Sequence, residues 1–168
     1  MGTGDAPTST PGGAVSIQWQ WAAFADLRAS DVYALLALRE AVFVVEQRCL
    51  FADLDWLDQK AMHLLGWQIN QGQLALVAYL RALPPGLKYS ECAIGRVVTA
   101  RSVRGTGIGK VLMGEGLRRT GERYPRQPIR IGAQSRLERF YAGFGFVTAS
   151  PPYDEDGIPH IEMLKSIS

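Results

Sequence analysis

A glycine-rich segment between an apolar run and a helical pattern constrains the fold more than any other feature of the sequence. The run from Glu91 to Ala100 predicts a central strand, Arg-Gly-Thr-Gly-Ile-Gly occupies positions 104–109, and a helix is expected from there to about Tyr124. The first amides of a helix lack partners within it, and the helix dipole favours an anion there. This order of elements predicts a phosphate-binding turn. A glycine-rich turn that starts a helix and holds no ligand is the competing interpretation.

Hydrophobic periodicity predicts the remaining elements. Alternation from Val15 to Trp21 indicates a half-buried strand. A helix should follow from Ser30, whose hydroxyl can cap its first turn, to about Gln47. Residues 63–69 and 74–83 form the clearest hairpin, because the sequence Asn-Gln-Gly-Gln between them favours a turn. Further strands are expected over 128–132, 144–149 and 158–164, and a further helix over 135–143.

The resulting order, β-α-β-β-β-α-β-α-β-β, predicts an α/β (α+β) fold in which helices cover a mixed sheet. At 168 residues the chain suits one domain with a sizeable core rather than two. Residues 1–14 are rich in Gly, Thr, Pro and Ser, lack the pattern of a signal peptide, and are expected to form a disordered tail before a domain at 15–168. No apolar run approaches membrane-spanning length, and we expect a cytoplasmic protein without membrane contact.

The spacing of the glycines separates the possible phosphate ligands. A nucleotide P-loop requires glycine where Arg104 stands and Ser or Thr where Val111 stands. The dinucleotide fingerprint G-x-G-x-x-G, begun at Gly105, would place its third glycine at Lys110. Both patterns fail. The pattern [Q/R]-x-x-G-x-[G/A] fits, with Arg104 and the last two glycines of the segment.

A second segment downstream raises the weight of this match. Residues 134–146 read Gln-Ser-Arg-Leu-Glu-Arg-Phe-Tyr-Ala-Gly-Phe-Gly-Phe, which resembles the pattern N-x-x-A-x-x-x-Y-x-x-x-G-F of the GNAT superfamily. Tyr141 and the pair Gly145-Phe146 fall on the family's residues, and Gln134 stands where many members carry Asn. With the glycine segment in its proper place, the chain resembles GNAT acetyltransferases from Gln18 to about Leu164. Residues 38–49 and 153–163 are similar to the ElaA-like subfamily.

The resemblance implies a fold and an acyl donor. The fold would be a single-domain GNAT fold, with a mixed central sheet of about seven strands splayed between the fourth and fifth and flanked by helices. The donor would be acetyl-coenzyme A, with no metal. Backbone amides freed at the splay would bind the pantetheine and polarise the thioester carbonyl. The residues expected to bind the cofactor are Val97, Val98, Arg104, Gly105, Thr106, Gly107, Ile108, Gly109, Lys110, Gln134 and Tyr141.

The implied reaction is direct attack of a deprotonated amine on the thioester within a ternary complex. Tyr141 is the expected general acid for the leaving thiolate, with a core aromatic as the alternative. His160 is one candidate for the base, because imidazole titrates near neutral pH, and an ordinary hydrogen-bonded histidine is the alternative. Glu46 is the other candidate, either as a base through a water or as a carboxylate that binds a cationic amine. Cys49 and Cys92 have no basic cluster nearby in sequence and are not expected to act as nucleophiles.

Charge is distributed unevenly along the chain. Residues 101–139 hold ten Lys or Arg against three Asp or Glu, and residues 31–58 hold six acids against two Arg. This suits an anionic cofactor that meets a cationic acceptor, either a small-molecule or a peptide amine, although two differently charged solvated faces would show the same pattern. Asp53, Asp55 and Asp58 are expected to form a solvated acidic loop rather than line an acceptor cleft.

Other partners and functions are also considered. The basic stretch lacks interleaved aromatic stacking positions, and no nucleic-acid partner is expected. A homodimer is compatible with the family, although no residue indicates one. The alternative function is a non-catalytic acyl-coenzyme A binding or sensing domain, which would have no need of Tyr141, His160 and Glu46.

Overall fold

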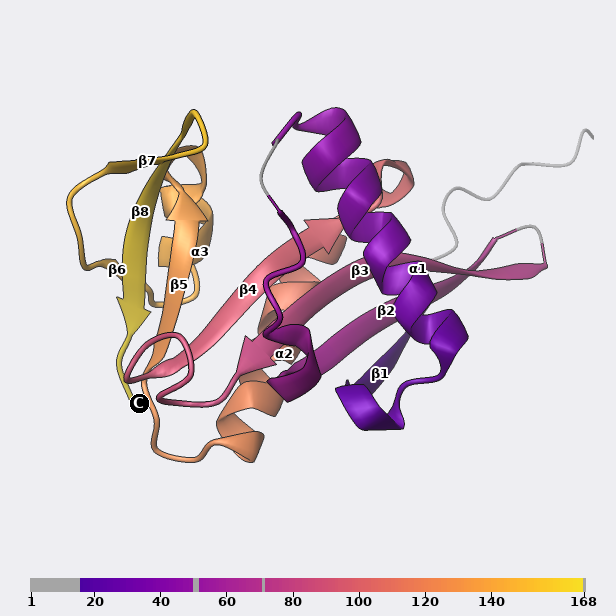
Figure 1. Cartoon of the computed structure of the whole chain (residues 1–168), viewed down its shortest axis with the longest axis horizontal. Coiled ribbons are helices and arrows are strands. Elements are labelled where there is room, and N and C mark those ends of the chain that lie inside the picture. The colour runs from indigo at the N-terminus through magenta and orange to yellow at the C-terminus, as the bar shows by residue number, and fades with distance from the viewer. Residues whose placement is uncertain (1–15, 50–51, 71, 168) are drawn as a thin grey trace, which may run out of the picture.

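A computed structural model describes residues 16–49, 52–70 and 72–167 of the chain. The tail predicted at 1–14 and Gln71 of the predicted turn lie outside the described residues. Within them the strands form one eight-stranded mixed sheet in the order β1-β2-β3-β4-β5-β8-β6, with β7 paired to β8 (Figure 1). The strands are β1 (Ile17–Ala23), β2 (Met62–Asn70), β3 (Gln73–Leu83), β4 (Cys92–Thr99), β5 (Ile129–Gln134), β6 (Val147–Thr148), β7 (Tyr153–Glu155) and β8 (Ile158–Lys165).

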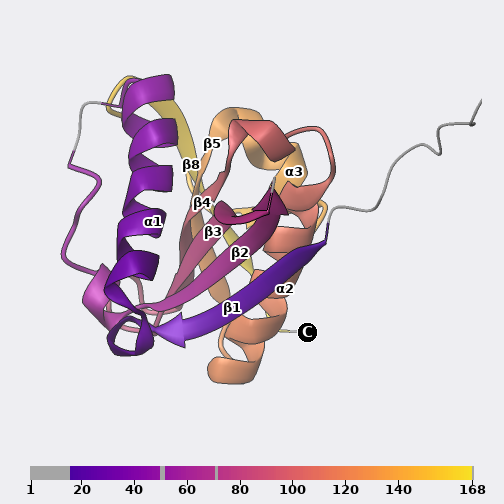
Figure 2. The same ribbon diagram turned by 90° about the vertical axis from the view of Figure 1, so that its right-hand side faces the viewer.

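Helices cover both faces of this sheet. The helix α1 (Ala29–Arg39), which continues as a π-helix over Glu40–Glu46, lies across one face. The helix α2 (Ile108–Arg123) lies on the opposite face, and the short α3 (Glu138–Ala142) follows β5 (Figure 2). The predicted α/β architecture, with one mixed sheet flanked by helices, is confirmed.

Apolar side chains fill the space on each side of the sheet. Under α2 the larger core includes Leu80 of β3 together with Leu112 and Met113, all fully buried. Under α1 a smaller core joins Leu35 to Tyr79 of β3, and both are fully buried as well. Burial of such side chains is the main favourable term in folding, and it fixes both helices against the central strands.

The sheet opens between β4 and β5. Among the described residues these parallel strands pair at two positions, Cys92 with Ile129 and Ala93 with Arg130, close to the start of each strand. By contrast, β5 pairs with β8 along its whole length. Beyond the two pairs β4 and β5 diverge (Figure 1), and their facing backbone groups lose the partners that a continued ladder would supply. The predicted splay between the fourth and fifth strands is confirmed.

The strand β4 carries a bulge beside this opening. Tyr79 pairs with Val98 and Arg81 pairs with Gly95, so that two residues of β4 lie opposite one residue of β3. One of the two, Arg96, has φ +54°, which is uncommon for a residue with a side chain. A bulge bends its strand and changes the direction of its side chains. The central strand therefore bends where it borders the opening.

The start of α1 differs from the prediction. Ser30 lies inside the first turn, and the helix begins at Ala29. The capping interaction comes from Asp31, whose carboxylate accepts the backbone amide of Arg28 at 3.2 Å and its guanidinium at 2.9 Å. An acidic side chain in the first turn also complements the helix dipole, and Asp31 takes the role that was predicted for Ser30.

The C-terminal part of the sheet differs as well. The strand predicted over 144–149 is reduced to the two residues of β6, and β7 was not predicted, so that the sheet has eight strands instead of about seven. A tight turn joins β7 to β8, with positive φ at Asp156 and Gly157 and a 3.0 Å hydrogen bond from the Gly157 amide to the Asp154 carboxylate. An exposed three-residue strand is too short to show an alternating pattern.

Two glycines of α2 provide a test of the larger core. A Cβ on Gly116 would lie 2.5 Å from a methyl carbon of the fully buried Leu80, whereas a Cβ on Gly114 meets nothing within 4 Å. We expect Gly116→Ala to lower the free energy of unfolding by about 1–3 kcal/mol through overpacking. Gly114→Ala should raise it by up to about 1 kcal/mol through helix propensity. Urea unfolding of both variants measures these changes. An equal increase in the free energy of unfolding for both variants would contradict the close packing of Gly116 against Leu80.

Candidate active site

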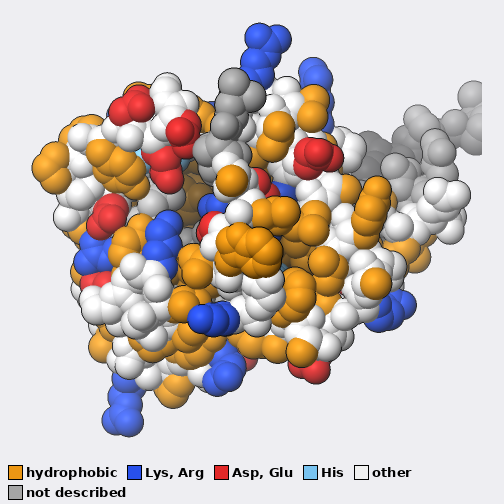
Figure 3. Space-filling view, viewed as in Figure 1, with side chains coloured by type: hydrophobic (Ala, Val, Ile, Leu, Met, Phe, Trp, Pro, Cys, Tyr) orange, Lys and Arg blue, Asp and Glu red, His pale blue; other side chains and the backbone are white. Residues whose placement is uncertain are grey.

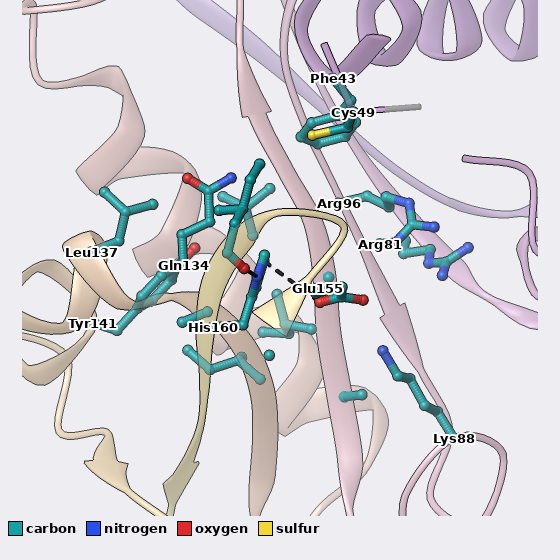
Figure 4. Close-up of a pocket in the computed structure, with 18 of the residues that line it drawn as sticks. Phe43, Cys49, Arg81, Lys88, Arg96, Gln134, Leu137, Tyr141, Glu155 and His160 are labelled. Carbon is teal, nitrogen blue, oxygen red and sulfur yellow. Dashed lines mark hydrogen bonds and ion pairs between the residues drawn. The ribbon is translucent and has the colours of Figure 1, made fainter. Parts of the chain in front are cut away.

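A pocket lies where β4 and β5 diverge, and it is lined by residues of β4, β5 and β8 and of the segments beside them. Figure 4 shows three groups of side chains around it: Leu137 and Tyr141 on one side, His160 and Glu155 in the middle, and Arg81, Arg96 and Lys88 on the other side. These groups come from segments far apart in the sequence. The opening of the sheet therefore brings titratable residues together in one place.

The glycine segment forms an open turn at the start of α2. Gly107 is the N-cap residue, with φ +89° and no side-chain hydrogen bond to the first turn. The hydroxyl of Thr106 is engaged elsewhere, since it donates to the carbonyl of Val103 at 2.6 Å. A Cβ placed on Gly105, Gly107 or Gly109 would meet nothing within 4 Å. The first amides of α2 thus stay uncapped and approachable, as an anion site requires.

Arg104 and Glu46 form an exposed ion pair with each other. The Arg104 guanidinium bonds both carboxylate oxygens of Glu46, one of them at 3.1 Å, and also reaches the carbonyl of Thr99 at 3.3 Å. Its hydrogen bonds lower the pKa of Glu46. Glu46 does not line the pocket, whereas Tyr141 and His160 both do. The structure thus brings two of the three predicted catalytic residues together.

Tyr141 belongs to α3 and is nearly buried, with 7% of its surface exposed. Its ring packs edge-on against Phe140 and Phe146, with centroid distances of 5.1 and 6.2 Å. Burial raises the pKa of Tyr141 to about 12, because it disfavours the charged phenolate. The side chain is thus held in the protonated form that a proton donor requires.

His160 lies on β8 and is held between a carbonyl and a carboxylate. Its Nδ1 is 2.8 Å from the carbonyl oxygen of Ile158, and since a carbonyl only accepts, Nδ1 must carry the hydrogen. In the neutral ring the lone pair is then on Nε2, which lies 3.5 Å from a carboxylate oxygen of Glu155. The ring also stacks on Tyr153 at 6.0 Å. This arrangement favours the tautomer with hydrogen on Nδ1 and directs Nε2 toward Glu155.

Of the other predicted cofactor residues, Ile108 and Lys110 lie in the first turn of α2, where Ile108 is buried and Lys110 is exposed. The rest lie on the two strands that border the opening. Gln134, the last residue of β5, lines the pocket and donates to the side chain of Gln47 at 3.2 Å, while its oxygen accepts from Arg136 at 2.9 Å. Val97 lies in the bulge and lines the pocket, whereas Val98 is buried and paired with Tyr79. Gln134 and Val97 thus reach the pocket, and Val98 lies just behind it.

The three aspartates after α1 are not a solvated acidic loop, as the sequence suggested. They form an ion cluster with three arginines that belong to α1, β3 and β4. Its six members are Arg39, Asp53, Asp55, Asp58, Arg81 and Arg96. Arg39 and Arg81 are almost completely buried. The aspartates are drawn inward because a buried guanidinium requires a carboxylate partner.

Asp58 and Asp53 hold the ion cluster together. Asp58 accepts from Arg39 at 2.9 Å and from Arg81 at 2.7 Å. Burial disfavours its carboxylate, but the two guanidinium groups outweigh this effect and lower the pKa of Asp58. Asp53 accepts from Arg39 at 2.8 Å and from Arg96 at 2.7 Å. The cluster therefore links α1 and β3 to the bulged residue of β4.

The two cysteines are free and buried. Burial raises the pKa of the Cys49 thiol and also that of the Cys92 thiol. Cys49 lines the pocket and Cys92 lies in the larger core. A thiol with a raised pKa is a poor nucleophile at neutral pH.

Comparison with known proteins assigns the family. The model of the acetyltransferase (GNAT) domain matches residues 57–167. The chain belongs to the GNAT acetyltransferase family. It is 40% identical over 153 residues to the protein ElaA of Escherichia coli, with 90% of this chain and 97% of ElaA covered. It is 41% identical over 150 residues to a UPF0039 protein of Synechocystis, with 89% and 96% covered.

Solved structures of GNAT proteins agree with this assignment. An acyl-CoA N-acyltransferase from Pseudomonas aeruginosa is 39% identical, with a TM-score of 0.84 over 90% of this chain and 100% of that one. The crystal structure of Escherichia coli ElaA gives 40% identity and a TM-score of 0.82 with the same coverage. The similarity to the ElaA-like subfamily is confirmed. Among the described residues, no helix is long and apolar enough to cross a membrane.

Asp58 provides a test of the ion cluster. We expect Asp58→Asn to lower the free energy of unfolding by about 3 kcal/mol, because two buried guanidinium groups lose the charge that they share. Urea unfolding at neutral pH measures the loss. The control is Glu122→Gln, which removes a carboxylate from an exposed ion pair with Arg118 and should change stability little. A small effect of Asp58→Asn on the free energy of unfolding would contradict a structural role for the ion cluster.

Proposed function

We propose that this protein transfers an acetyl group from acetyl-coenzyme A to an amine by direct attack within a ternary complex. The single observation that carries the proposal is the pocket at the opening of β4 and β5, which contains Tyr141 and His160. Membership of the GNAT family supports acyl transfer from an acyl-coenzyme A in general. The acetyl group, the amine and the roles of residues below are our proposal.

The donor would bind along the turn before α2 and the edge of β4. The amides of residues 105–109 and the ammonium of Lys110 suit a pyrophosphate, because the helix start is uncapped and unobstructed. Arg104 has N–H groups beyond those that bond Glu46, and it would donate one of them to a phosphate oxygen while it stays paired with Glu46. The backbone of Val97 and Val98 would bind the pantetheine and polarise the thioester carbonyl, with Gln134 at the facing end of β5.

The transfer step needs one acid and one base. The amine nitrogen attacks the thioester carbon, a C–N bond forms and the C–S bond breaks. The leaving thiolate takes a proton from the Tyr141 hydroxyl, and the nitrogen loses a proton to the base. The products are an N-acetyl amide and free coenzyme A thiol. Tyr141 suits the acid because it is held protonated at the pocket wall.

For the base, the geometry favours His160 over Glu46. The lone pair of His160 Nε2 is available in the tautomer that Ile158 imposes, and Glu155 can stabilise the imidazolium that forms. Glu46 is paired with Arg104, which lowers its pKa and weakens it as a base. We therefore propose that His160 takes the proton and that Glu46 serves to position Arg104.

A non-catalytic acyl-coenzyme A sensor is the alternative function. It would bind acetyl-coenzyme A in the same turn but release no thiol. The discriminating measurement is thiol release from acetyl-coenzyme A with a panel of small-molecule and peptide amines. Binding without release for every amine would favour the sensor and overturn the proposed transfer.

Gly109 tests the donor site. We expect Gly109→Leu to weaken binding of coenzyme A by about tenfold or more, because a side chain would stand where the phosphates approach the uncapped amides. The protein should stay folded, since a Cβ there meets nothing within 4 Å and Leu favours a helix. Calorimetric titration with coenzyme A gives the affinity. The matched control is Gly114→Leu in the same helix, and equal losses in both variants would argue against the site.

Tyr141 tests the proposed acid. We expect Tyr141→Phe to lower kcat by about a hundredfold, because the thiolate loses its proton donor. The KM for acetyl-coenzyme A should change little, since the ring still packs against Phe140 and Phe146. Steady-state thiol release measures both constants. Tyr33→Phe, at a side chain with 80% exposure, is the control, and full activity of Tyr141→Phe would remove Tyr141 from the mechanism.

A further inference from the structure

We infer that the acceptor is a zwitterion of the amino-acid type, which places its amine near Glu155 and His160 and its carboxylate near Lys88. The inference rests on the proposed function and names the class of amine. Figure 4 shows Glu155 between His160 on one side and Lys88 on the other, at the end of the pocket away from Tyr141. A substrate that enters from there meets both signs of charge before it reaches the thioester.

At this end of the pocket, the charged side chains outside the ion cluster are the ones that a ligand meets. The cluster contains three arginines and three aspartates, and its charges cancel. Arg81 and Arg96 line the pocket as members of this neutral group. Lys88 and Glu155 also line it but stand outside the group. They are therefore the two ions at this end whose charge a ligand could still balance.

Lys88 is held in place without a carboxylate partner among the described residues. Its ammonium lies 5.2 Å from the ring centre of Tyr89, a cation–π contact. Its neighbours Leu87 and Tyr89 pack against a small buried cluster that contains Leu83. The amide of Gly86 also donates to the carbonyl of Tyr89 at 2.7 Å, which closes the turn around Lys88. The ordered turn thus brings the ammonium of Lys88, an exposed residue, to the pocket.

Glu155 and His160 form the opposite end of the recognition site. Glu155 is held at 3.5 Å from His160 Nε2 and has 47% of its side chain exposed. An exposed carboxylate beside an imidazole attracts an ammonium ion. The ammonium would lose one proton to solvent before the attack, and His160 would take the second proton during the transfer. Burial lowers the pKa of the Lys88 ammonium, and the negative charge of Glu155 opposes this effect, although no ion pair joins the two. Two opposite charges that face one pocket without neutralising each other match a ligand with both signs.

Other amines fit this arrangement less well. A polyamine would bring a second cation towards Lys88, and like charges repel. The N-terminus of a long peptide carries an amide where an amino acid carries its carboxylate, and it would leave Lys88 without an anion. Figure 3 shows charged side chains of both signs over the half of the molecule that contains β5 and β8, and not a uniformly acidic surface suited to a polycation. The charge pattern therefore favours a compact zwitterion.

Matched pairs of acceptors test the inference. Thiol release from acetyl-coenzyme A is measured with L-tyrosine and tyramine, L-histidine and histamine, L-lysine and cadaverine, and then with the other common L-amino acids. We expect the amino acid of an accepted pair to show a kcat/KM about tenfold to a hundredfold higher than its decarboxylated amine, the range for one charge-assisted hydrogen bond. Equal or better turnover of the decarboxylated amines would overturn the inference and leave acetyl transfer intact.

Variants of Lys88 test whether this residue causes the preference for amino acids over their decarboxylated amines. Lys88→Met should remove most of the preference by lowering kcat/KM for the amino acid alone, and Lys88→Arg should keep it. Lys60→Met, at an exposed lysine outside the pocket, is the matched control. An equal loss for both members of a pair would contradict a carboxylate contact at Lys88.

Absence of turnover with every amine would count against the proposed function. In that case acceptor binding, measured without turnover, tests the inference by itself. Calorimetric titration of the same pairs into the protein with coenzyme A measures acceptor binding without chemistry. Tighter binding of amino acids than of their decarboxylated amines, lost in Lys88→Met, would support the inference even so. Equal binding, or no binding of any amino acid, would overturn it.

Discussion

The buried ion cluster is the interaction on which the site depends. In most of the sheet, neighbouring strands fix each other through backbone hydrogen bonds, but within the described part of the chain β4 has no such partner on one side beyond its first two pairs with β5. Its bulged residue, Arg96, is held by Asp53 through a 2.7 Å hydrogen bond, and Asp53 is held in turn by Arg39 of α1. Side-chain charges thus stabilise the strand where the ladder stops.

Such a cluster specifies geometry more than it adds stability. Removing several ions from water costs free energy that their mutual attraction offsets only when every partner is well placed. The neighbouring polar groups are matched in the same way: His63 lies 2.8 Å from the hydroxyl of Tyr79 and 2.9 Å from the carbonyl of Asp58. Burial lowers the pKa of His63, so that it stays neutral beside the arginines. A shift of one member would leave a buried charge unpaired, and this keeps the bend in β4 in one conformation.

Local features of the sequence were sufficient to predict the glycine turn and the helix after it, since uncapped amides and helical periodicity are properties of contiguous residues. Tyr141 was singled out by the resemblance to the GNAT pattern, and it lines the pocket. The ion cluster could not be predicted in that way, because Arg96 and Asp53 lie 43 positions apart. Aspartates between apolar residues look like a solvated loop until the arginines that they meet are known. The same limit applies to Lys88, whose role depends on which charges the cluster leaves unbalanced.

The two sides of the site therefore differ in how they are built. Under the proposed function, donor recognition would depend on backbone groups at the ends of β4 and α2, which many sequences can supply provided that the glycines remain. Acceptor recognition would depend on the charges of side chains from three separate segments: the loop before β4, β7 and β8. Backbone geometry can stay the same while single substitutions at positions such as Lys88 or Glu155 change the net charge that an acceptor meets. In this fold, acceptor choice can then change without disturbing either the opening of the sheet or the ion cluster that maintains it.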